Sequence, residues 1–346
     1  MISIAHFEDY LAGPEITVRT VLQRMNDAQH QICLVIDEER RLLGTVTDGD
    51  IRRAILQGAA LDDSVERCMF RAPTVGRTDR ALEHPRLLKG LPFLPLVDSA
   101  GHVSSLLLPS ESPFGISEAV VMVGGLGQRM GSITETTPKP LLHVAGRPIL
   151  EHILDNLEAA GVTRIWLAIN HLAEQFRSFA EKRGGPAEIR FLQEPKKLGT
   201  AGALATLPET PPGPLLVVNG DVLTQVNFTA LDAFHQAHSL DGTIAVAQHQ
   251  VRVPFGVVGH DQQGLFTGIN EKPLLTNFVA AGIYYLSPAV LALIPKDCPT
   301  DMPDVLNNAH KVGMRLGLFP IHEYWAEVGH PEDLETADAF YRANGA

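Results

Sequence analysis

Apolar runs alternate along much of this chain with segments whose apolar residues recur at helical spacing. From residue 118 onward, the apolar runs at 118–123, 164–170 and 215–219 have the length of buried strands. Between them, 147–161 carries apolar residues three and four positions apart, with a proline near its start and a glycine at its end, which predicts a helix. Strands that alternate with helices predict a doubly wound, mostly parallel sheet with helices on both faces.

In the later part of this block, strand-like runs become more frequent than helical patterns. A strand is predicted at 190–194 and a helix at 200–207. From 243 to 286 strand-like runs dominate, which indicates antiparallel strands added beside the parallel sheet. The fold class expected for the block is therefore α/β with a mixed sheet.

The first hundred residues form a separate block. A stretch rich in Pro and Ser at 108–117 has the composition of a linker. The sequence thus predicts one domain at 1–107 and a larger one at 118–346.

The first block contains an internal repeat. Residues 34–50 align without gaps to residues 95–111, with Asp37 over Asp98, and each copy has the pattern strand, turn, strand. After the first copy, a helical pattern ends at Gly58. A repeat spacing near sixty residues indicates two copies of one supersecondary unit packed together, a small α+β pair.

Charge and composition narrow the class of protein. The net charge of -12 argues against binding to nucleic acid or to an anionic membrane, although a local cluster of cations can still hold a small phosphate. Cys33, Cys68 and Cys298 have no CxxC spacing, so neither a disulfide framework nor a zinc site is expected. The chain has no run of 18 apolar residues and begins without a signal-peptide pattern, so we expect a cytoplasmic protein.

A glycine-rich loop follows the strand at 118–123. It fits neither the GxxxxGK[ST] nor the GxGxxG phosphate-binding pattern. The N–H groups of Gly124, Gly125 and Gly127 nevertheless form a concavity suited to an anion. Arg129 adds a forked donor for phosphate oxygens. Lys139 adds a point charge, and the prolines on either side of it restrict its backbone.

Taken with later segments, this loop resembles the signature of the sugar-1-phosphate nucleotidyltransferases. The segments that match in order and approximate spacing are GGLGQRMGSITETTPKPLL (124–142), LGTAGAL (198–204), VVNGDVL (217–223), NEKP (270–273), AGIYYL (281–286) and YWAEVGHPEDL (324–334). Three positions depart from the family. Gln128 stands where Thr is usual, Ala280 where Asn is frequent, and Glu327 where the family has Asp.

The resemblance implies transfer of a nucleoside monophosphate from an NTP to a sugar-1-phosphate, with pyrophosphate released and Mg²⁺ as cofactor. GTP is the first choice of NTP, because LGTAGAL looks most like the guanylyltransferase branch. The implied roles are catalysis by Arg129, Lys139 and Asp221; nucleotide binding by Gly124, Gly125, Gly127, Gly199, Thr200 and Gly202; sugar-phosphate binding by Glu271, Lys272 and Gly282; and metal binding by Asp221 and Glu327.

The first block resembles a pair of CBS domains, on the residues GTVTDGDIRRAI at 44–55. The resemblance implies that Thr47 and Asp50 bind the ribose and phosphate of an adenine nucleotide effector. The second copy has Leu108 and Glu111 at these positions, so at most one competent site is expected. A packing and dimerisation module without a ligand is an equal alternative, and a homo-oligomer is expected because CBS pairs commonly associate.

Two functions from different classes therefore remain. The first is the transferase. The second is a non-catalytic regulatory protein that senses adenine nucleotide through the CBS pair. Because a sensor needs no metal-binding acid, the presence of Asp221 beside Arg129 and Lys139 favours the transferase.

Overall fold

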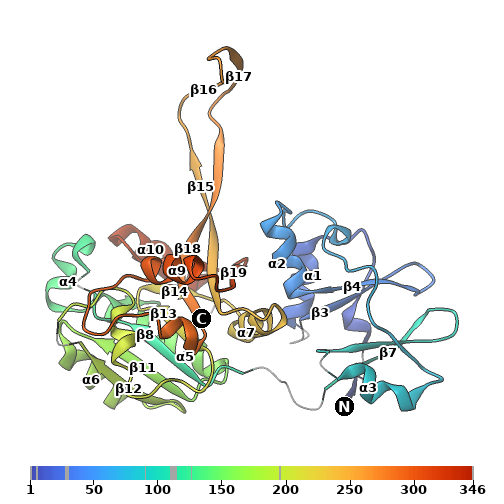
Figure 1. Ribbon diagram of the computed structural model, residues 1–346, viewed down its shortest axis with the longest axis horizontal. Coiled ribbons are helices and arrows are strands. Elements are labelled where there is room, and N and C mark those ends of the chain that lie inside the picture. Colours follow the sequence, from blue (N-terminus) through green and yellow to red (C-terminus); the bar gives the residue numbers. More distant parts are fainter. Residues whose placement is uncertain are drawn as a thin grey trace. The chain divides into compact units, whose positions relative to one another are not determined.

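The computed structural model describes residues 2–4, 7–27, 31–89, 91–109, 115–125, 127–194 and 196–344. The chain divides into two compact units, Met1–Gly115 and Ile116–Ala346 (Figure 1). Residues 110–114, which belong to the predicted linker at 108–117, lie outside the described residues.

The first unit contains two small sheets. One has the strand order β1-β7-β6-β5 and the other has the order β2-β3-β4. In chain order its elements are β1 (Ile2–Ile4), the 3-10 helix η1 (Phe7–Tyr10), β2 (Leu11–Ala12), α1 (Val18–Asp27), β3 (Ile32–Ile36), β4 (Leu42–Thr47), α2 (Asp48–Leu56), η2 (Val65–Arg67), β5 (Gly76–Arg77), η3 (Ala81–Glu83), α3 (His84–Leu88), β6 (Leu94–Val97) and β7 (Val103–Leu108).

The internal repeat of the first unit has the same turn in both copies. Asp37 accepts hydrogen bonds from the backbone N–H groups two and four residues on, and Asp98 does the same between β6 and β7. The equivalent residues Arg40 and Gly101 both have positive φ, 65° and 90°. An aspartate side chain that bonds its own turn explains why this residue stands at both positions.

The second unit is built on a seven-stranded sheet. Its elements are β8 (Glu118–Met122), η4 (Gln128–Met130), α4 (Ile133–Thr136), η5 (Lys139–Leu141), β9 (His143–Val144), β10 (Arg147–Pro148), α5 (Ile149–Ala159), β11 (Arg164–Ile169), α6 (Ala173–Arg183), β12 (Glu188–Gln193), η6 (Gly202–Thr206), β13 (Leu215–Asn219), β14 (Val222–Thr224), α7 (Phe228–Ala237), β15 (Gly242–Arg252), β16 (Val257–His260), β17 (Phe266–Asn270), β18 (Leu274–Leu286), α8 (Pro288–Leu291), α9 (Met302–Lys311), β19 (Leu316–Pro320), β20 (Trp325–Glu327) and α10 (Pro331–Ala343).

The strand order of this sheet is β12-β11-β8-β13-β18-β15-β19. Adjacent strands from β12 to β13 are parallel, β18 is antiparallel to both of its neighbours, and β19 is parallel to β15. Only β18 therefore runs against the other strands of this sheet. The predicted α/β fold with a mixed, mostly parallel sheet is confirmed.

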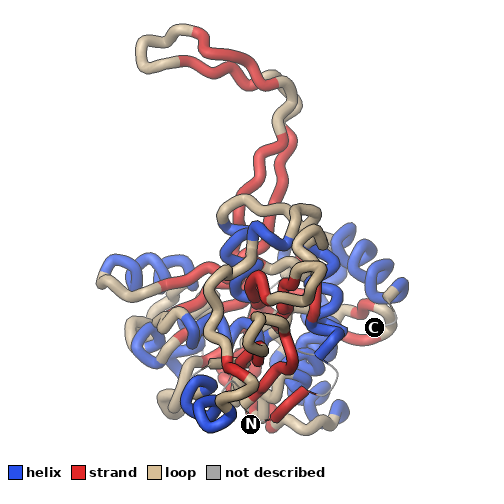
Figure 2. Tube along the Cα trace, turned by 90° about the vertical axis from the view of Figure 1, so that its right-hand side faces the viewer, coloured by secondary structure: helices blue, strands red, loops and turns tan. Residues whose placement is uncertain are grey.

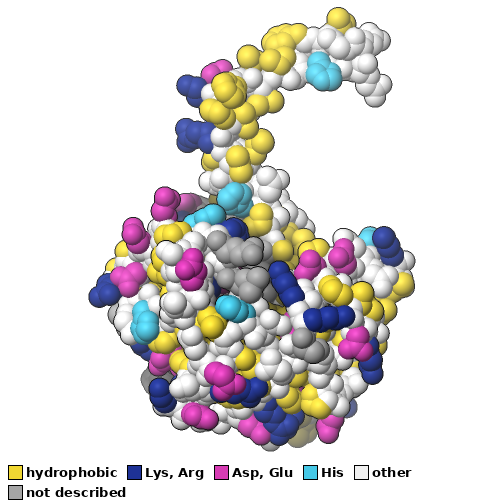
Figure 3. Space-filling view, turned by 90° about the vertical axis from the view of Figure 1, so that its left-hand side faces the viewer, with side chains coloured by type: hydrophobic (Ala, Val, Ile, Leu, Met, Phe, Trp, Pro, Cys, Tyr) yellow, Lys and Arg dark blue, Asp and Glu magenta, His cyan; other side chains and the backbone are white. Residues whose placement is uncertain are grey.

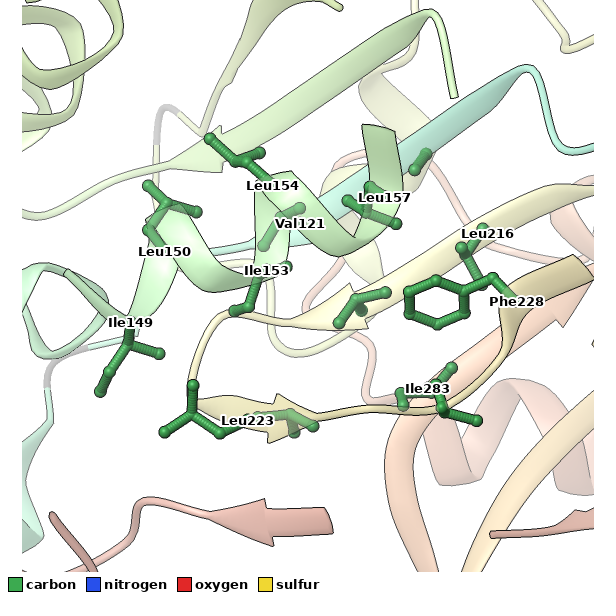
Figure 4. Packing of buried hydrophobic residues seen from close by; sticks show 14 of the residues in the cluster. Val121, Ile149, Leu150, Ile153, Leu154, Leu157, Leu216, Leu223, Phe228 and Ile283 are labelled. Carbon is green, nitrogen blue, oxygen red and sulfur yellow. The ribbon is translucent and has the colours of Figure 1, made fainter. Parts of the chain in front are cut away.

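The helix α5 shows how the apolar pattern holds this unit together. Its residues Ile149, Leu150, Ile153, Leu154 and Leu157 are all buried and belong to one apolar cluster with residues of the sheet, among them Val121 and Leu216 (Figure 4). A fully buried aliphatic side chain contributes about 1.5–3 kcal/mol to stability. The helix thus anchors the segment that leads out of the glycine-rich loop.

Two segments differ from the sequence predictions. The predicted helix at 200–207 is instead the short 3-10 helix η6, because the backbone before it is bonded to a neighbouring loop at 298–302. The strands predicted between 243 and 286 do extend the sheet, but β16 and β17 leave it as a projecting hairpin (Figures 1 and 2). In the part of the chain that the structure describes, no helix combines the length and the apolar composition needed to cross a bilayer.

Candidate active site at the edge of the central sheet

The glycine-rich loop and Asp221 meet at the carboxyl ends of the parallel strands, which form one edge of the sheet. The parallel strands β8 and β13 are neighbours, so their carboxyl ends lie side by side. The N–H of Gly220 donates to the carbonyl of Met122, a bond of 2.9 Å that joins the two strand ends. Open α/β sheets bind their ligands at such an edge.

Lys139 and Asp221 form a short ion pair at this edge. The Nζ of Lys139 lies 2.6 Å from Oδ2 of Asp221, and the lysine side chain is only 8% exposed. Lys139 opens the 3-10 helix η5, with Pro138 before it and Pro140 after it. The chain therefore fixes a buried cation before any ligand arrives, at the cost of taking both charges out of water.

The second predicted metal ligand, Glu327, is tied to Asp221 through the backbone. In the β14–β20 ladder Val222 stands opposite Glu327, and the N–H of Val328 donates to the carbonyl of Asp221 over 2.9 Å. Asp221, directly before β14, and Glu327, at the end of β20, are thus held near each other, although they are 106 positions apart in the sequence. A short ladder of this kind holds both backbones in register.

Arg129 pairs with Glu327, but in a more open setting. Its Nη2 lies 3.0 Å from Oε1 of the glutamate, and the two side chains are 62% and 42% exposed. Exposed ion pairs contribute little to stability, so this arginine can change partner at small cost. The site therefore combines a fixed cation with an adaptable one.

The glycines of the loop have different surroundings. A side chain at Gly124 would come within 2.9 Å of Oε1 of Glu194, whereas one at Gly125 would meet no atom within 4 Å. Gly127 has a φ of 63° and packs against Thr134. Gly124 and Gly127 are thus required by packing and conformation, and Gly125 borders open space. Leu126 and the side chain of Gln128 lie outside the described residues.

Glu194 is a site residue that the sequence patterns missed. It follows β12 at the same edge of the sheet and is 6% exposed. Its Oε2 accepts the N–H of Leu198 at 2.9 Å, and burial raises the pKa of its carboxyl above the ordinary value. An acid that directly follows a predicted strand of the parallel sheet was the available signal.

The predicted nucleotide contacts at 199–202 are engaged with another loop. The Oγ1 and backbone N of Thr200 both donate to Oδ1 of Asp301, at 3.2 and 2.9 Å. A side chain at Gly199 would lie 2.6 Å from the carbonyl oxygen of Thr300, and one at Gly202 would lie 2.8 Å from Cβ of Leu198. Close packing thus explains these residue types, and their contact with a nucleotide stays a prediction.

Gly282 lies where β18 passes the end of β13. Its φ is 72°, and a side chain there would meet the amide of Asn219 at 2.8 Å. The neighbouring carbonyl of Ala281 accepts the indole N–H of Trp325 at 2.9 Å. This glycine therefore lies beside the end of β13, and its role in leaving room for a sugar stays a prediction.

Glu271 and Lys272 are not brought to this edge. Both are exposed on the projecting hairpin, where Lys272 has a φ of 49° and donates its N–H to the carbonyl of Phe255. Ten residues separate Lys272 from Gly282, a contour length of roughly 30 Å for extended chain. Their role in sugar-phosphate binding stays a prediction.

Thr47 and Asp50 form a capping box at the start of α2 in the first unit. The threonine hydroxyl lies 2.6 Å from Oδ2 of Asp50 and accepts the N–H of Asp50 at 3.1 Å. The aspartate also pairs with Arg53. Both side chains thus have a structural role, and nucleotide binding by them stays a prediction. Glu111 of the second copy lies outside the described residues.

The two predicted metal ligands fit a magnesium ion. Within the described residues, no group of three or more His, Cys, Asp or Glu side chains could hold a metal. Mg²⁺ nevertheless needs only one or two carboxylates when substrate phosphates and water complete its shell. Asp221, which directly precedes β14, and Glu327 at the end of the neighbouring β20 have donors of this kind, and their binding of a metal stays a prediction.

Comparison with known proteins agrees with this geometry. The model of the nucleotidyl transferase family matches residues 118–344, and that of the CBS domain matches residues 10–57. The first match covers more than half of the chain. The chain therefore belongs to the nucleotidyl transferase family.

Its relatives include enzymes of sugar nucleotide synthesis. The chain is 35% identical to the mannose-1-phosphate guanylyltransferase catalytic subunit beta of Drosophila pseudoobscura pseudoobscura, over 65% of this chain and 62% of that protein. It is 34% identical to mannose-1-phosphate guanyltransferase of Schizosaccharomyces pombe, over 65% of this chain and 64% of that protein. The chain thus spans less than two thirds of these relatives. The crystal structure of HddC from Yersinia pseudotuberculosis has the same fold, with a TM-score of 0.51 and 24% identity over 65% of this chain and all of HddC.

Proposed function

We propose that this chain transfers GMP from GTP to a sugar-1-phosphate, yielding a GDP-sugar and pyrophosphate. The observation that carries the proposal is the ion pair of buried Lys139 with half-buried Asp221, which lies beside the glycine-rich loop at the carboxyl end of the parallel strands. The names of the relatives, mannose-1-phosphate guanylyltransferases, support both the reaction class and the base.

The reaction needs positioning and charge neutralisation more than covalent chemistry. An oxygen of the sugar phosphate forms a bond to the α-phosphorus of GTP. The bond from that phosphorus to the bridging oxygen breaks, and pyrophosphate leaves. Lys139 neutralises the α-phosphate, where charge develops, and the N–H groups of Gly124 and Gly125 hold the neighbouring oxygens. Arg129, which is exposed and adaptable, follows the departing β and γ phosphates.

Asp221 and Glu327 are the residues that would hold Mg²⁺. The ion supplies positive charge to the phosphates when it is bound. Each carboxylate pairs with a cation in the structure, Asp221 with Lys139 and Glu327 with Arg129. Carboxylates engaged by a bound metal would leave Lys139 and Arg129 available to the phosphates.

Glu194 supports guanine as the base. Guanine presents an N–H and an amino group on one edge, which are two adjacent donors. A carboxylate accepts such a pair, whereas it has no donor for adenine's ring nitrogen. Because one oxygen of Glu194 is bonded to Leu198 and the other lies near Gly124, the acceptor faces the loop that would hold GTP.

The test is pyrophosphate release across four NTPs and a panel of sugar-1-phosphates that includes mannose-1-phosphate, with Mg²⁺ present. We expect GTP to support the fastest release, and release to stop when the metal is chelated. Absence of pyrophosphate with every pair would contradict the proposal. Faster release with another NTP would keep the transferase and overturn the role of Glu194 in base choice.

We also propose that an adenine nucleotide binds the first unit at Thr47 and Asp50. A ribose hydroxyl can replace the bond between their side chains, which lie 2.6 Å apart. We expect such a ligand to act on the transferase through the linker. Deletion of residues 1–112 should therefore abolish any response of the kinetics to AMP, and an unchanged response would contradict the idea.

A further inference from the structure

The hairpin that leaves the central sheet is the most apolar exposed part of the second unit. We define the arm as residues 248–278, which comprise the outer parts of β15 and β18 together with β16 and β17. The structure describes all of these residues, and none is buried. The arm projects away from the rest of its unit (Figures 1 and 2).

Large apolar side chains are concentrated on the arm. It carries nine of the fifteen exposed ones that are found among the described residues, namely Val251, Phe255, Val257, Val258, Leu265, Phe266, Ile269, Leu274 and Leu275, with exposures from 44% to 72%. Hydrophobic side chains follow the arm in the space-filling view (Figure 3). The two phenylalanines among them, Phe255 and Phe266, each bury about 150–250 Å² when fully covered. A monomer seldom exposes more than a few hundred Å² of contiguous apolar surface, and one partner of a standard interface buries about 800 Å².

One face of the arm joins this apolar surface to the predicted sugar-phosphate residues. Val258 stands opposite Ile269 in the β16–β17 ladder, so their side chains share a face. Glu271 lies two residues beyond Ile269, and both cover Gly256, whose Cβ would lie 2.7 Å from Oε2 of Glu271 and 2.8 Å from Cδ1 of Ile269. Any surface that covers Val258 and Ile269 therefore also meets Glu271.

The base of the arm continues the central sheet and resists folding back. The β15–β18 ladder runs without a shift from Val246–Ala280 to Arg252–Leu274, and its one irregularity lies inside the body, between Ile244 and Val246. Bringing Lys272 to Asp221 of the same chain would break this ladder. A second copy of the chain provides the same acceptor edge without that loss.

The charges of the arm permit this association. Arg252 and Lys272 balance Asp261 and Glu271, so the arm is neutral in a chain of net charge -12. The acidic body of a second copy therefore does not repel the arm. A twofold dimer in which each arm reaches the other copy buries both apolar surfaces at once.

We propose that the arm docks on the catalytic unit of a second copy and delivers Glu271 and Lys272 to the sugar-phosphate side of that copy's site. The delivery of these two residues rests on the proposed function, whereas the docking itself does not. Each site of the dimer then combines Lys139 and Asp221 of one copy with Glu271 and Lys272 of the other.

The first test measures association of the full-length chain by sedimentation. We expect a dimer at micromolar concentration, and a monomer when Val258→Lys and Ile269→Lys are combined. Val312→Lys is the control, because Val312 is 58% exposed on the body of the same unit. A monomeric wild type, or a double variant that sediments like the wild type, overturns the docking surface whether or not the protein is a transferase.

The second test asks whether the site is shared. Copies with Asp221→Ala and with Lys272→Ala carry different affinity tags, and the mixed dimer is isolated by two purification steps. Delivery across the dimer leaves one of its two sites intact, so about half of the wild-type pyrophosphate release is expected, although each variant alone is impaired. A mixed dimer no more active than the average of the two variants means that the arm serves its own chain, and this overturns the proposal. Full activity of Lys272→Ala alone overturns the delivery of that residue, whereas a wild type inactive with every substrate overturns the proposed function and leaves the sedimentation result in force.

Discussion

Lys139 and Lys272 are both predicted to contact a phosphate, but Lys139 is held in a packed part of the structure and Lys272 is exposed on the arm. Lys139 is 8% exposed, stands between two prolines and is paired with Asp221 at 2.6 Å. Lys272 is exposed on the arm, with its backbone in the left-handed region. The sheet edge thus holds its cation in place in advance, whereas the arm holds a cation that must still be ordered.

This difference suggests a division of labour between the two regions. Fixing a lysine side chain in one conformation costs up to about 2 kcal/mol of conformational entropy. For Lys139 at the sheet edge, this entropy is already lost when the chain folds. A fixed site suits the triphosphate, whose α-phosphorus must be aligned with the attacking oxygen. In the proposed function, the arm would order later, around the sugar phosphate.

The largest effect is expected at the fixed region, from Asp221→Ala. The change removes a metal ligand and leaves Lys139 buried without its partner, so we expect kcat to fall by ~10²–10³. Pyrophosphate release at saturating GTP and sugar phosphate measures this loss. Asp304→Ala, at an exposed acid in the first turn of α9, is the matched control and should leave kcat unchanged. If Asp221→Ala keeps more than a tenth of the wild-type kcat, the sheet edge is not the reaction centre.

A smaller and more selective effect is expected on the arm, from Lys272→Ala. A hydrogen bond to a charged group contributes about 1.5–3 kcal/mol, so kcat/KM for the sugar phosphate should fall about 10- to 100-fold. The KM for GTP should not change, because the nucleotide is held at the sheet edge. Initial rates with one substrate varied at a time separate the two parameters.

Lys296→Ala removes an exposed lysine from the body of the same unit and is the control for this variant. If Lys272→Ala raised the KM for GTP as much as the KM for the sugar phosphate, the arm and the sheet edge would not have separate roles in substrate binding.

The local patterns of the sequence predicted the elements around the sheet edge of Lys139 and Asp221 well. Apolar runs and helical spacing predicted β8, β11, β13 and α5, because each of these elements buries one continuous set of side chains. The motifs also singled out Lys139 and Asp221, whose contact is set by the order of β8 and β13 in the sheet. No local signal fixes that contact; it depends on the parallel topology.

The arm was predicted only as strand-like sequence. Val258, Phe266 and Ile269 have the residue types of a buried strand, and no local pattern distinguishes a strand that packs in its own chain from one that is left exposed. The helix predicted at 200–207 failed for a related reason, since Ala201 and Gly202 donate their N–H groups to the carbonyl of Thr300, far away in the sequence. Long-range contacts decided both outcomes.

A third change, Glu194→Gln, tests how the fixed region recognises the base. We expect about a tenfold rise in the KM for GTP, because the amide presents a donor where guanine needs an acceptor. In the wild type this KM should rise as the pH falls through the raised pKa of Glu194, where the carboxylate is protonated. The Gln variant should lose that acid limb, which kinetics between pH 4 and 8 would reveal.

The same variant also has a predicted effect on stability. The folded-state pKa of Glu194 lies above its unfolded value, so the stability linked to this group is present at low pH and lost as the pH rises through the folded pKa. Glu194→Gln should therefore raise the unfolding midpoint at neutral pH, and the gain should vanish below the unfolded pKa. A lower midpoint at neutral pH would show that the carboxylate stabilises the fold instead.

The smallest effect is expected outside both regions, at the capping box of α2. Thr47→Ala removes the side-chain acceptor of the Asp50 N–H, so the first unit should lose about 1 kcal/mol of its free energy of unfolding in urea. Thr78→Ala, at an exposed threonine in the loop after β5, controls for the loss of a hydroxyl. The kcat measured without AMP should not change, since the reaction centre lies in the other unit. AMP should raise the unfolding midpoint of the wild type but not of Thr47→Ala if Thr47 contacts the ribose. An equal shift in both proteins would place the effector elsewhere and leave Thr47 with its capping role alone.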